Sequence, residues 1–128
     1  MEMLITNGIR VSVQPQYQPA YSRPVLGQYV FSYHIVIENC SDQTVQLLYR
    51  HWIITDGIGF TREVEGEGVI GLQPVLEAGA VHAYDSWCPL PTPLGFMEGR
   101  YLMARTDNNE RFYVDIPRFR MEAIELLN

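Results

Sequence analysis

The feature that most constrains the fold is a period of two in the side chains of one long segment. The stretch YVFSYHIVIEN, residues 29–39, places an aromatic or branched aliphatic residue at every second position. Side chains two residues apart lie on one face of a β-strand, and these residue types favour strands. The pattern predicts a long, partly buried strand whose inner face is formed by Tyr29, Phe31, Tyr33, Ile35 and Ile37.

The next two segments extend this strand into a meander. The run TVQLLYRHWIITD, residues 44–56, also alternates and places Arg50 and Trp52 on one face and His51 on the other. The pair Asp56-Gly57 supplies a turn, since Asp bonds to nearby backbone and Gly tolerates unusual dihedrals. A strand over FTREVEGEG, residues 60–68, follows it, so we expect three consecutive antiparallel strands.

Further strands are predicted over residues 7–13, 80–87, 98–105 and 111–123, the last two joined by a turn at 106–109. Proline-containing loops are expected at 14–28 and from Pro89 to Pro93, and the acidic tail 121–127 is the one candidate helix.

About seven short strands in 128 residues predict a single all-β domain, 1–128. We expect an antiparallel β-sandwich of the fibronectin III or immunoglobulin type. Tyr101 is interpreted either as a tyrosine corner or as an ordinary core residue.

The charged residues exclude several functions. The net charge is −6, and acids outnumber bases fifteen to nine, which argues against sequence-independent binding of nucleic acid. All nine bases are arginine. Without lysine the chain has no Schiff-base residue and no Walker-type phosphate lysine, although arginine can still bind carboxylates or phosphates.

The N-terminal segment and the cysteines predict a cytoplasmic protein. The first residues carry an early acid and no basic region of the kind that opens a secretory signal, and no apolar run approaches the roughly 18 residues of a membrane span. Cys40 and Cys88 are far apart in sequence. We interpret them as reduced, small hydrophobic residues, with a disulfide as the alternative.

The segment GEGVIG, residues 66–71, matches the G-x-G-x-x-G pattern of nucleotide-binding loops through Gly66, Gly68 and Gly71. That pattern binds pyrophosphate when a helix follows it, and here the chain continues with the broken segment 72–79. A bulge or a close backbone approach is therefore the favoured interpretation. An anion-binding loop of successive amides is the alternative, opposed by the nearby glutamates.

Glu63, Glu65 and Glu67 alternate along one predicted strand face and raise the question of a metal site. Same-face residues are about 7 Å apart on a strand, too far for all three to share one small ion, so we predict a solvated face and no metal or other cofactor. The three histidines have no ligand-like spacing and are interpreted as buried or half-buried structural residues. No catalytic constellation stands out in the sequence.

Arg50, Trp52 and Trp87 form the candidate interaction patch. With Arg50 and Trp52 outward and His51 inward, the second strand would present a cationic and aromatic surface, and Trp87 beside the proline-rich loop would supply a second part. A core position for Trp52 is the alternative.

Several spaced motifs resemble the ApaG family. They lie in LLYRHWIITDGIGFTREVEGEGVIGLQPVLEAG, AYDSWCPLPTPLGFMEGRYLM and FYVDIPRF, and the likeness extends over nearly the whole chain. This sequence departs from the family pattern at residues 56–59 and at Trp87-Cys88, without disturbing the framework. The resemblance implies a fibronectin III-like sandwich and supplies no catalytic residue.

The same resemblance implies an association with cobalt resistance and magnesium transport, a protein-interaction role in eukaryotic relatives, and a pyrophosphate role for the glycine motif. We therefore expect a small, non-enzymatic, cytosolic domain that binds an unidentified protein partner. The alternative is an anion-binding protein that uses Gly66, Gly68 and Gly71, with Mg²⁺ or Co²⁺ on Glu63 or Glu65. Self-association through edge strands is also expected, and binding to nucleic acid or membrane is not.

Overall fold

The computed structural model describes residues 1–123, which form strands and short 3₁₀ turns. The two 3₁₀ turns are η1 (Pro19–Tyr21) and η2 (Pro24–Leu26). The described residues contain nine strands: β1 (Glu2–Thr6), β2 (Ile9–Tyr17), β3 (Tyr29–Asn39), β4 (Val45–Asp56), β5 (Thr61–Glu67), β6 (Val75–Leu76), β7 (Val81–Leu90), β8 (Leu94–Arg105) and β9 (Arg111–Glu122). Within residues 1–123, no helix has the length and apolar character needed to cross a membrane.

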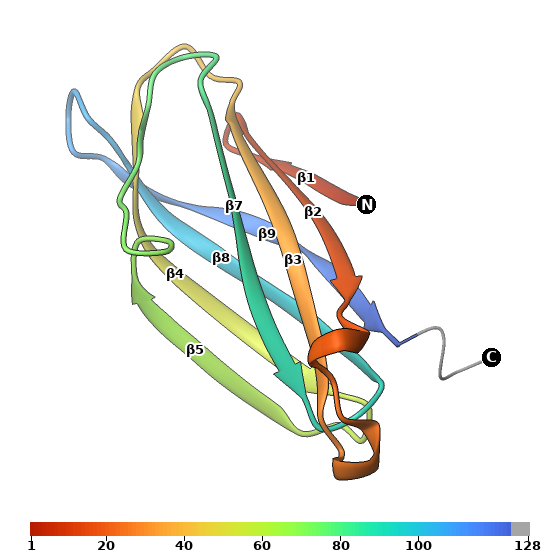
Figure 1. Cartoon of the computed structure of the whole chain (residues 1–128). Helices are drawn as coiled ribbons and strands as arrows, with labels where there is room; N and C mark the ends of the chain where they lie inside the picture. The colour runs from red at the N-terminus through yellow and green to blue at the C-terminus, as the bar shows by residue number, and fades with distance from the viewer. Residues whose placement is uncertain (124–128) are drawn as a thin grey trace.

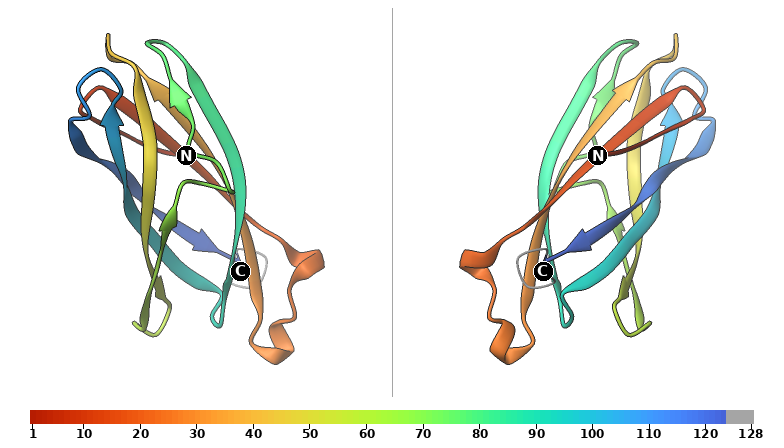
Figure 2. Two further views of the ribbon diagram at one scale, coloured as in Figure 1. Left: turned by 90° about the vertical axis from the view of Figure 1, so that its left-hand side faces the viewer. Right: turned by 90° about the vertical axis from the view of Figure 1, so that its right-hand side faces the viewer.

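The strands form two antiparallel sheets that pack face to face (Figures 1 and 2). One sheet has the order β1-β2-β3-β7, and the other has the order β5-β4-β8-β9 with β6 paired to β4. Their inner faces share one core cluster, which includes Phe31, Trp52, Tyr101 and Phe119. This arrangement confirms the predicted all-β antiparallel sandwich.

The N-terminal hairpin is more extensive than predicted. We expected one strand over residues 7–13, but β1 and β2 are two strands joined at Asn7-Gly8, where φ is +51° and +80°. Positive φ at both central residues is typical of a type I′ turn, and an Asn-Gly pair favours it. Because β2 continues to Tyr17, the predicted loop at 14–28 is also shorter.

The predicted face of β3 is confirmed at its centre. Phe31, Tyr33, Ile35 and Ile37 are buried, while Tyr29 at the strand start is half-buried. These side chains meet the inner face of the opposite sheet, as shown by the tilted contact between the Tyr33 and Phe119 rings at 5.6 Å. The period of two was sufficient to assign this strand, because β3 pairs with β2 and β7 without a register shift.

The predicted faces of β4 are wrong beyond Leu47. A bulge between Leu47 and Tyr49 adds one residue to β4 relative to β8. A bulge inverts the alternation that follows it, so Val45 and Leu47 share the inner face with Trp52 and not with His51. Trp52 is only 3% exposed, and His51 lies on the outer face.

The structure also corrects two smaller predictions and decides between the two interpretations of Tyr101. Pro89 belongs to the edge strand β7, where a missing N–H is tolerated, so the proline-rich loop is shorter than expected. Tyr101 lies within β8, fully buried, and its hydroxyl pairs with that of Tyr84 at 2.5 Å, which confirms the core alternative over the tyrosine corner. The candidate helix at 121–127 begins as the end of β9, and its residues 124–127 lie outside the described residues.

Candidate functional site

The two long sides of the sandwich are built differently. On one side, the β1–β2 hairpin contacts β9: the Asn7 side-chain amide donates to the carbonyl of Tyr113 at 3.0 Å, and the Asp115 amide donates to the Thr6 hydroxyl at 3.2 Å. On the other side, the edge strands β5 and β7 flank a cleft of about 260 Å³ between the sheets. We call this the open cleft. In Figure 2 the two sheets are seen edge-on as two layers.

The open cleft combines an apolar base with polar walls. Tyr33, Trp52 and Met97 belong to the buried core and line its deep part. Its walls carry the side chains of Arg50 and Arg62, and those of Tyr84, Ser86 and Cys88 from β7. A cleft with an apolar base and a few converging polar groups is the usual form of a binding site.

Arg62 spans the open cleft from β5 to β7. Its Nη2 donates to the carbonyl of Pro89 at 2.7 Å and lies 3.6 Å from the sulfur of Cys88. Burial raises the pKa of the Cys88 thiol, and the guanidinium of Arg62 opposes that rise. Cys88 is therefore a protonated, buried thiol at neutral pH, in agreement with the predicted structural role.

Arg50 binds the backbone of the glycine motif. Its Nη1 donates to the carbonyls of Glu67 at 3.0 Å and Gly68 at 3.1 Å. A side chain at Gly66, which pairs with Arg50 across the strands, would place its Cβ only 2.9 Å from the same nitrogen. Glycine at position 66 therefore leaves room for the guanidinium.

The rest of the glycine motif is a tight turn in an all-β setting. Gly68 has φ +62°, and a Cβ there would lie 2.1 Å from the carbonyl oxygen of Leu72. Its amide donates to the carbonyl of Leu48 at the bulge of β4, and Val69 and Leu72 exchange two backbone hydrogen bonds across Ile70-Gly71. The close backbone approach predicted for this motif is present. Gly71 borders the open cleft, whereas the Gly68 amide is already engaged within the protein.

The three residues of the predicted interaction patch all line the open cleft, but in different ways. Arg50 projects into it, and Trp87, 51% exposed, lies on its rim with an edge-on contact to Tyr21. Trp52 packs in the core against Tyr33, so the predicted outward position of its ring is wrong. The physical reason is the bulge in β4, which also brings Arg50 to the inner side.

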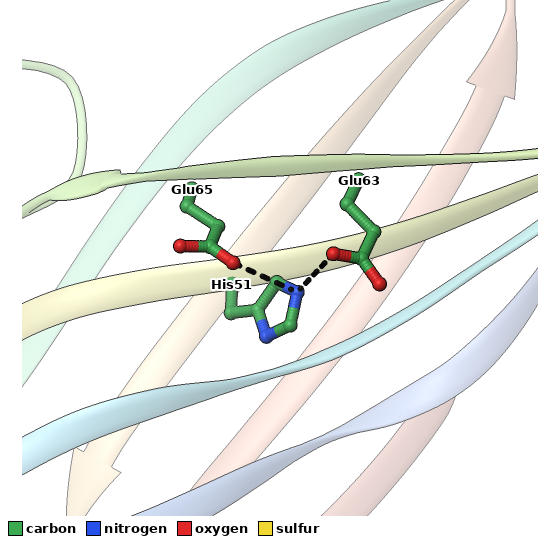
Figure 3. Close-up of side chains that lie close together, drawn as sticks. All are labelled: His51, Glu63 and Glu65. Carbon is green, nitrogen blue, oxygen red and sulfur yellow. Dashed lines mark ion pairs between the residues drawn. The ribbon is translucent and has the colours of Figure 1, made fainter.

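A second cluster lies on the outer face of the β4–β5 hairpin, where His51 sits between Glu63 and Glu65 (Figure 3). The Nε2 atom of His51 is 3.4 Å from Oε2 of Glu63 and 3.5 Å from Oε1 of Glu65. Glu67 pairs with Tyr49 further along the hairpin. The sequence prediction treated the three glutamates separately from His51. The turn at Asp56-Gly57 is the sequence signal that indicates how β4 and β5 pair, and this pairing brings His51 next to Glu65.

The other two histidines have separate surroundings. His34 is exposed, and its Nδ1 lies 2.9 Å from a carboxylate oxygen of Asp85, so its predicted burial is wrong. His82 is half-buried beside Tyr84, as expected for a structural residue.

Comparison with known proteins places these features in a family context. A family model described as the ApaG domain matches residues 19–105. The chain is 47% identical to Protein ApaG of Rhodopseudomonas palustris (strain TIE-1) over 125 residues, 98% of this chain and 95% of the relative. It is 50% identical to Protein ApaG of Maricaulis maris (strain MCS10) over 115 residues, with 90% and 88% covered. A crystal structure of an ApaA protein from Bordetella pertussis matches with a TM-score of 0.87 at 45% identity and covers 89% of this chain and 92% of that one.

Proposed function

We propose that this chain, which belongs to the ApaG domain family, is a non-enzymatic binding domain that holds a protein partner at the open cleft. The observation that carries the proposal is the pair Arg50 and Arg62, which line a cleft and have no carboxylate partner among residues 1–123. The protein is acidic overall. Three of its seven other arginines are paired with glutamates, and Arg100 and Arg118 lie over aromatic rings. Two unpaired guanidinium groups in one cleft therefore favour a ligand that carries negative charge.

Both arginines have N–H donors that form no hydrogen bond within the described residues. Arg50 uses Nη1 for the carbonyls of the glycine motif, and its Nη2 has no acceptor in the described part of the chain. Arg62 uses Nη2 for Pro89. Each guanidinium has five N–H donors, so both retain the capacity to bind a carboxylate.

Exposed apolar side chains surround this charge. Ile70 is 61% exposed and Trp87 is 51% exposed, and both border the open cleft together with the exposed Val64. Aromatic residues and arginines are the side chains most often found at the energetic centre of protein interfaces. We infer that the partner presents an acidic side chain beside an apolar one.

Photo-crosslinking in cells tests this proposal. A benzoylphenylalanine at position 70 or 87 should give a crosslinked partner, identified by mass spectrometry, whereas the same residue at exposed Tyr113 of β9 should not. The additional change Arg50→Gln should abolish the adducts while circular dichroism and thermal unfolding confirm the fold. Equal adducts at all three positions, or adducts unaffected by Arg50→Gln, would contradict the proposal.

A second candidate function is the binding of a small phosphate-containing anion in the same cleft. It is favoured by the two arginines beside Gly71, since arginine binds phosphate in a bidentate manner. A divalent ion on Glu63 or Glu65 would not assist, because those side chains lie on the outer face of the sheet. The anion would therefore depend on the arginines more than on the amides of Gly66, Gly68 and Gly71.

A ¹⁵N NMR titration with pyrophosphate distinguishes the two candidates. Saturable shifts at Gly71, lost in Arg50→Gln and Arg62→Gln and retained in Arg111→Gln, would support the anion. Spectra that do not change up to about 1 mM, which corresponds to about −4 kcal/mol, would exclude it and leave the protein partner.

A further inference from the structure

Three potential metal ligands converge on the outer face of the β4–β5 hairpin, away from the open cleft (Figure 3). One donor atom from each of His51, Glu63 and Glu65 lies within 4.8 Å of the other two. An ion with tetrahedral bonds of roughly 2.0–2.1 Å holds neighbouring ligand atoms about 3.3 Å apart. The distances from His51 Nε2 to the two carboxylates, 3.4 and 3.5 Å, already match this spacing.

The strand pairing holds these ligands in place. His51 and Glu65 are directly paired across β4 and β5, and Glu63 is two residues along the same face of β5. Directly paired residues have Cβ atoms roughly 5 Å apart, so their side chains can reach one ion. The strand pairing therefore places all three side chains on one face, and Glu63, the most exposed of them, has the most freedom to rotate toward an ion.

Tyr49 orients one of the carboxylates from outside the cluster. Its hydroxyl donates to Oε2 of Glu65 at 3.0 Å, so the other oxygen, Oε1, is directed toward His51. An outer hydrogen bond of this kind fixes a carboxylate in the direction needed for coordination.

The histidine nitrogen at the centre has no hydrogen bond. Nε2 of His51 is shielded from solvent, yet it forms no hydrogen bond with either of the two nearby carboxylates. Neither Glu63 nor Glu65 pairs with an arginine in the described residues. Nε2 is within ion-pair distance of both carboxylate oxygens without a hydrogen bond, and a cation bound between all three would satisfy them together.

The donor set selects the class of ion. One imidazole nitrogen and two carboxylate oxygens suit zinc and neighbouring first-row divalent ions, whereas Mg²⁺ prefers oxygen ligands in octahedral geometry. We propose that His51, Glu63 and Glu65 form a binding site for a divalent transition-metal ion such as Zn²⁺. Three protein ligands leave at least one coordination position for water.

Calorimetric titration of the full chain with Zn²⁺ tests this proposal. One ion should bind per chain, and Mg²⁺ at the same concentration should not compete. His51→Ala and Glu63→Gln should each weaken Zn²⁺ binding by about tenfold or more, whereas His34→Ala, at the His34–Asp85 pair of the other sheet, should leave it unchanged.

Glu63→Gln is the decisive variant, because this exposed side chain makes no hydrogen bond in the described structure and its replacement leaves the fold intact. The His51 imidazole signals should shift on Zn²⁺ addition in the wild-type NMR spectrum and fail to shift in Glu63→Gln at the same concentration. Absence of Zn²⁺ binding by the wild type, unchanged binding in His51→Ala, or equal loss in His34→Ala would overturn the proposal.

Discussion

The sandwich has a closed side, where the β1–β2 hairpin contacts β9, and an open side, where the edge strands β5 and β7 flank the open cleft. On the closed side, Ile9, Val11 and Val13 of β2 are fully buried near β9, and the hairpin hydrogen-bonds to the backbone of β9. On the open side, Arg50 and Arg62 line the cleft between the edge strands β5 and β7, and Arg62 bridges them through its hydrogen bond to Pro89. This difference indicates that the shared core and the closed side can hold the two sheets together while the other edge stays open, and that open edge is the one that we propose as the binding site.

The largest expected effect contrasts isoleucine on the two sides. Ile9→Ala should destabilise the protein by about 2–5 kcal/mol, because it removes methyl groups from a fully buried site. Ile70→Ala, at a side chain 61% exposed on the open side, should change the free energy of unfolding by no more than about 0.5 kcal/mol. Urea unfolding measures both, and similar losses would remove the distinction between the sides.

The second prediction compares two glycines of the glycine motif on the open side. Gly68→Ala should cost about 2–4 kcal/mol, from the left-handed backbone and the clash with the Leu72 carbonyl. Gly71→Ala has the same sign of φ but nothing within 4 Å of the new Cβ, so about 1 kcal/mol is expected. Urea unfolding of both variants gives the ratio, and equal losses would show that the close approach at Gly68 is unimportant.

The third prediction concerns the Tyr84–Tyr101 bond, which joins the two sheets beneath the open cleft. Tyr101→Phe leaves the buried Tyr84 hydroxyl without this partner and should cost about 1–3 kcal/mol. Thermal or urea unfolding at neutral pH measures the loss. A variant as stable as the wild type would mean that the hydroxyl pair does not hold the sheets together on this side.

The fourth prediction is that the Tyr84–Tyr101 pair makes the protein less stable at alkaline pH. Burial raises the pKa of Tyr101 and Tyr84 above the ordinary value near 10. Above that pH the unfolded chain loses tyrosine protons that the folded chain keeps, so the unfolded state binds fewer protons and the free energy of unfolding falls as pH rises. Urea unfolding across this range should show the decline, reduced in Tyr101→Phe, and an unchanged slope in the variant would contradict the assignment.

The smallest effect is expected for the arginine that spans the open side. Arg62→Gln removes the hydrogen bond to Pro89 from a solvent-exposed guanidinium, and its cost should stay below about 1 kcal/mol. Unfolding of this variant beside Arg111→Gln, an exposed arginine of β9, measures it. A much larger loss would mean that Arg62 closes the sandwich and leaves no side free for binding.

Much of the fold could be predicted because the side-chain alternation that indicates a β-strand is contained within a few consecutive residues. Phe31, Ile35 and Ile37 were placed correctly on the inner face from alternation alone, and the missing helix after Gly71 placed the glycine motif in a β context. The hairpin at Asn7-Gly8 was missed although its turn signal is present in the sequence. The core position of Trp52 could not be fixed, because it depends on a bulge whose presence is decided by pairing with β8.

The candidate sites were less predictable than the strands that carry them. Arg50 and Trp87 were assigned to the interaction patch and Gly71 to the glycine motif. The structure brings all three to one cleft together with Arg62, which no sequence pattern distinguished. His51 was assigned to the inner face and now lies with Glu63 and Glu65 on the outer face. In both cases the partners belong to strands whose relative position depends on register or on the packing of two sheets.

By itself, the sequence determined the strand-rich architecture, the acidic charge and the absence of lysine chemistry, since these follow from residue types and their local period. The tertiary structure decided which face each β4 side chain occupies, which edge of the sandwich stays open, and which side chains meet there. The physical reason is that alternation records only neighbours along the chain. A bulge, a cross-strand register and the separation of two sheets are set by contacts between residues distant in sequence.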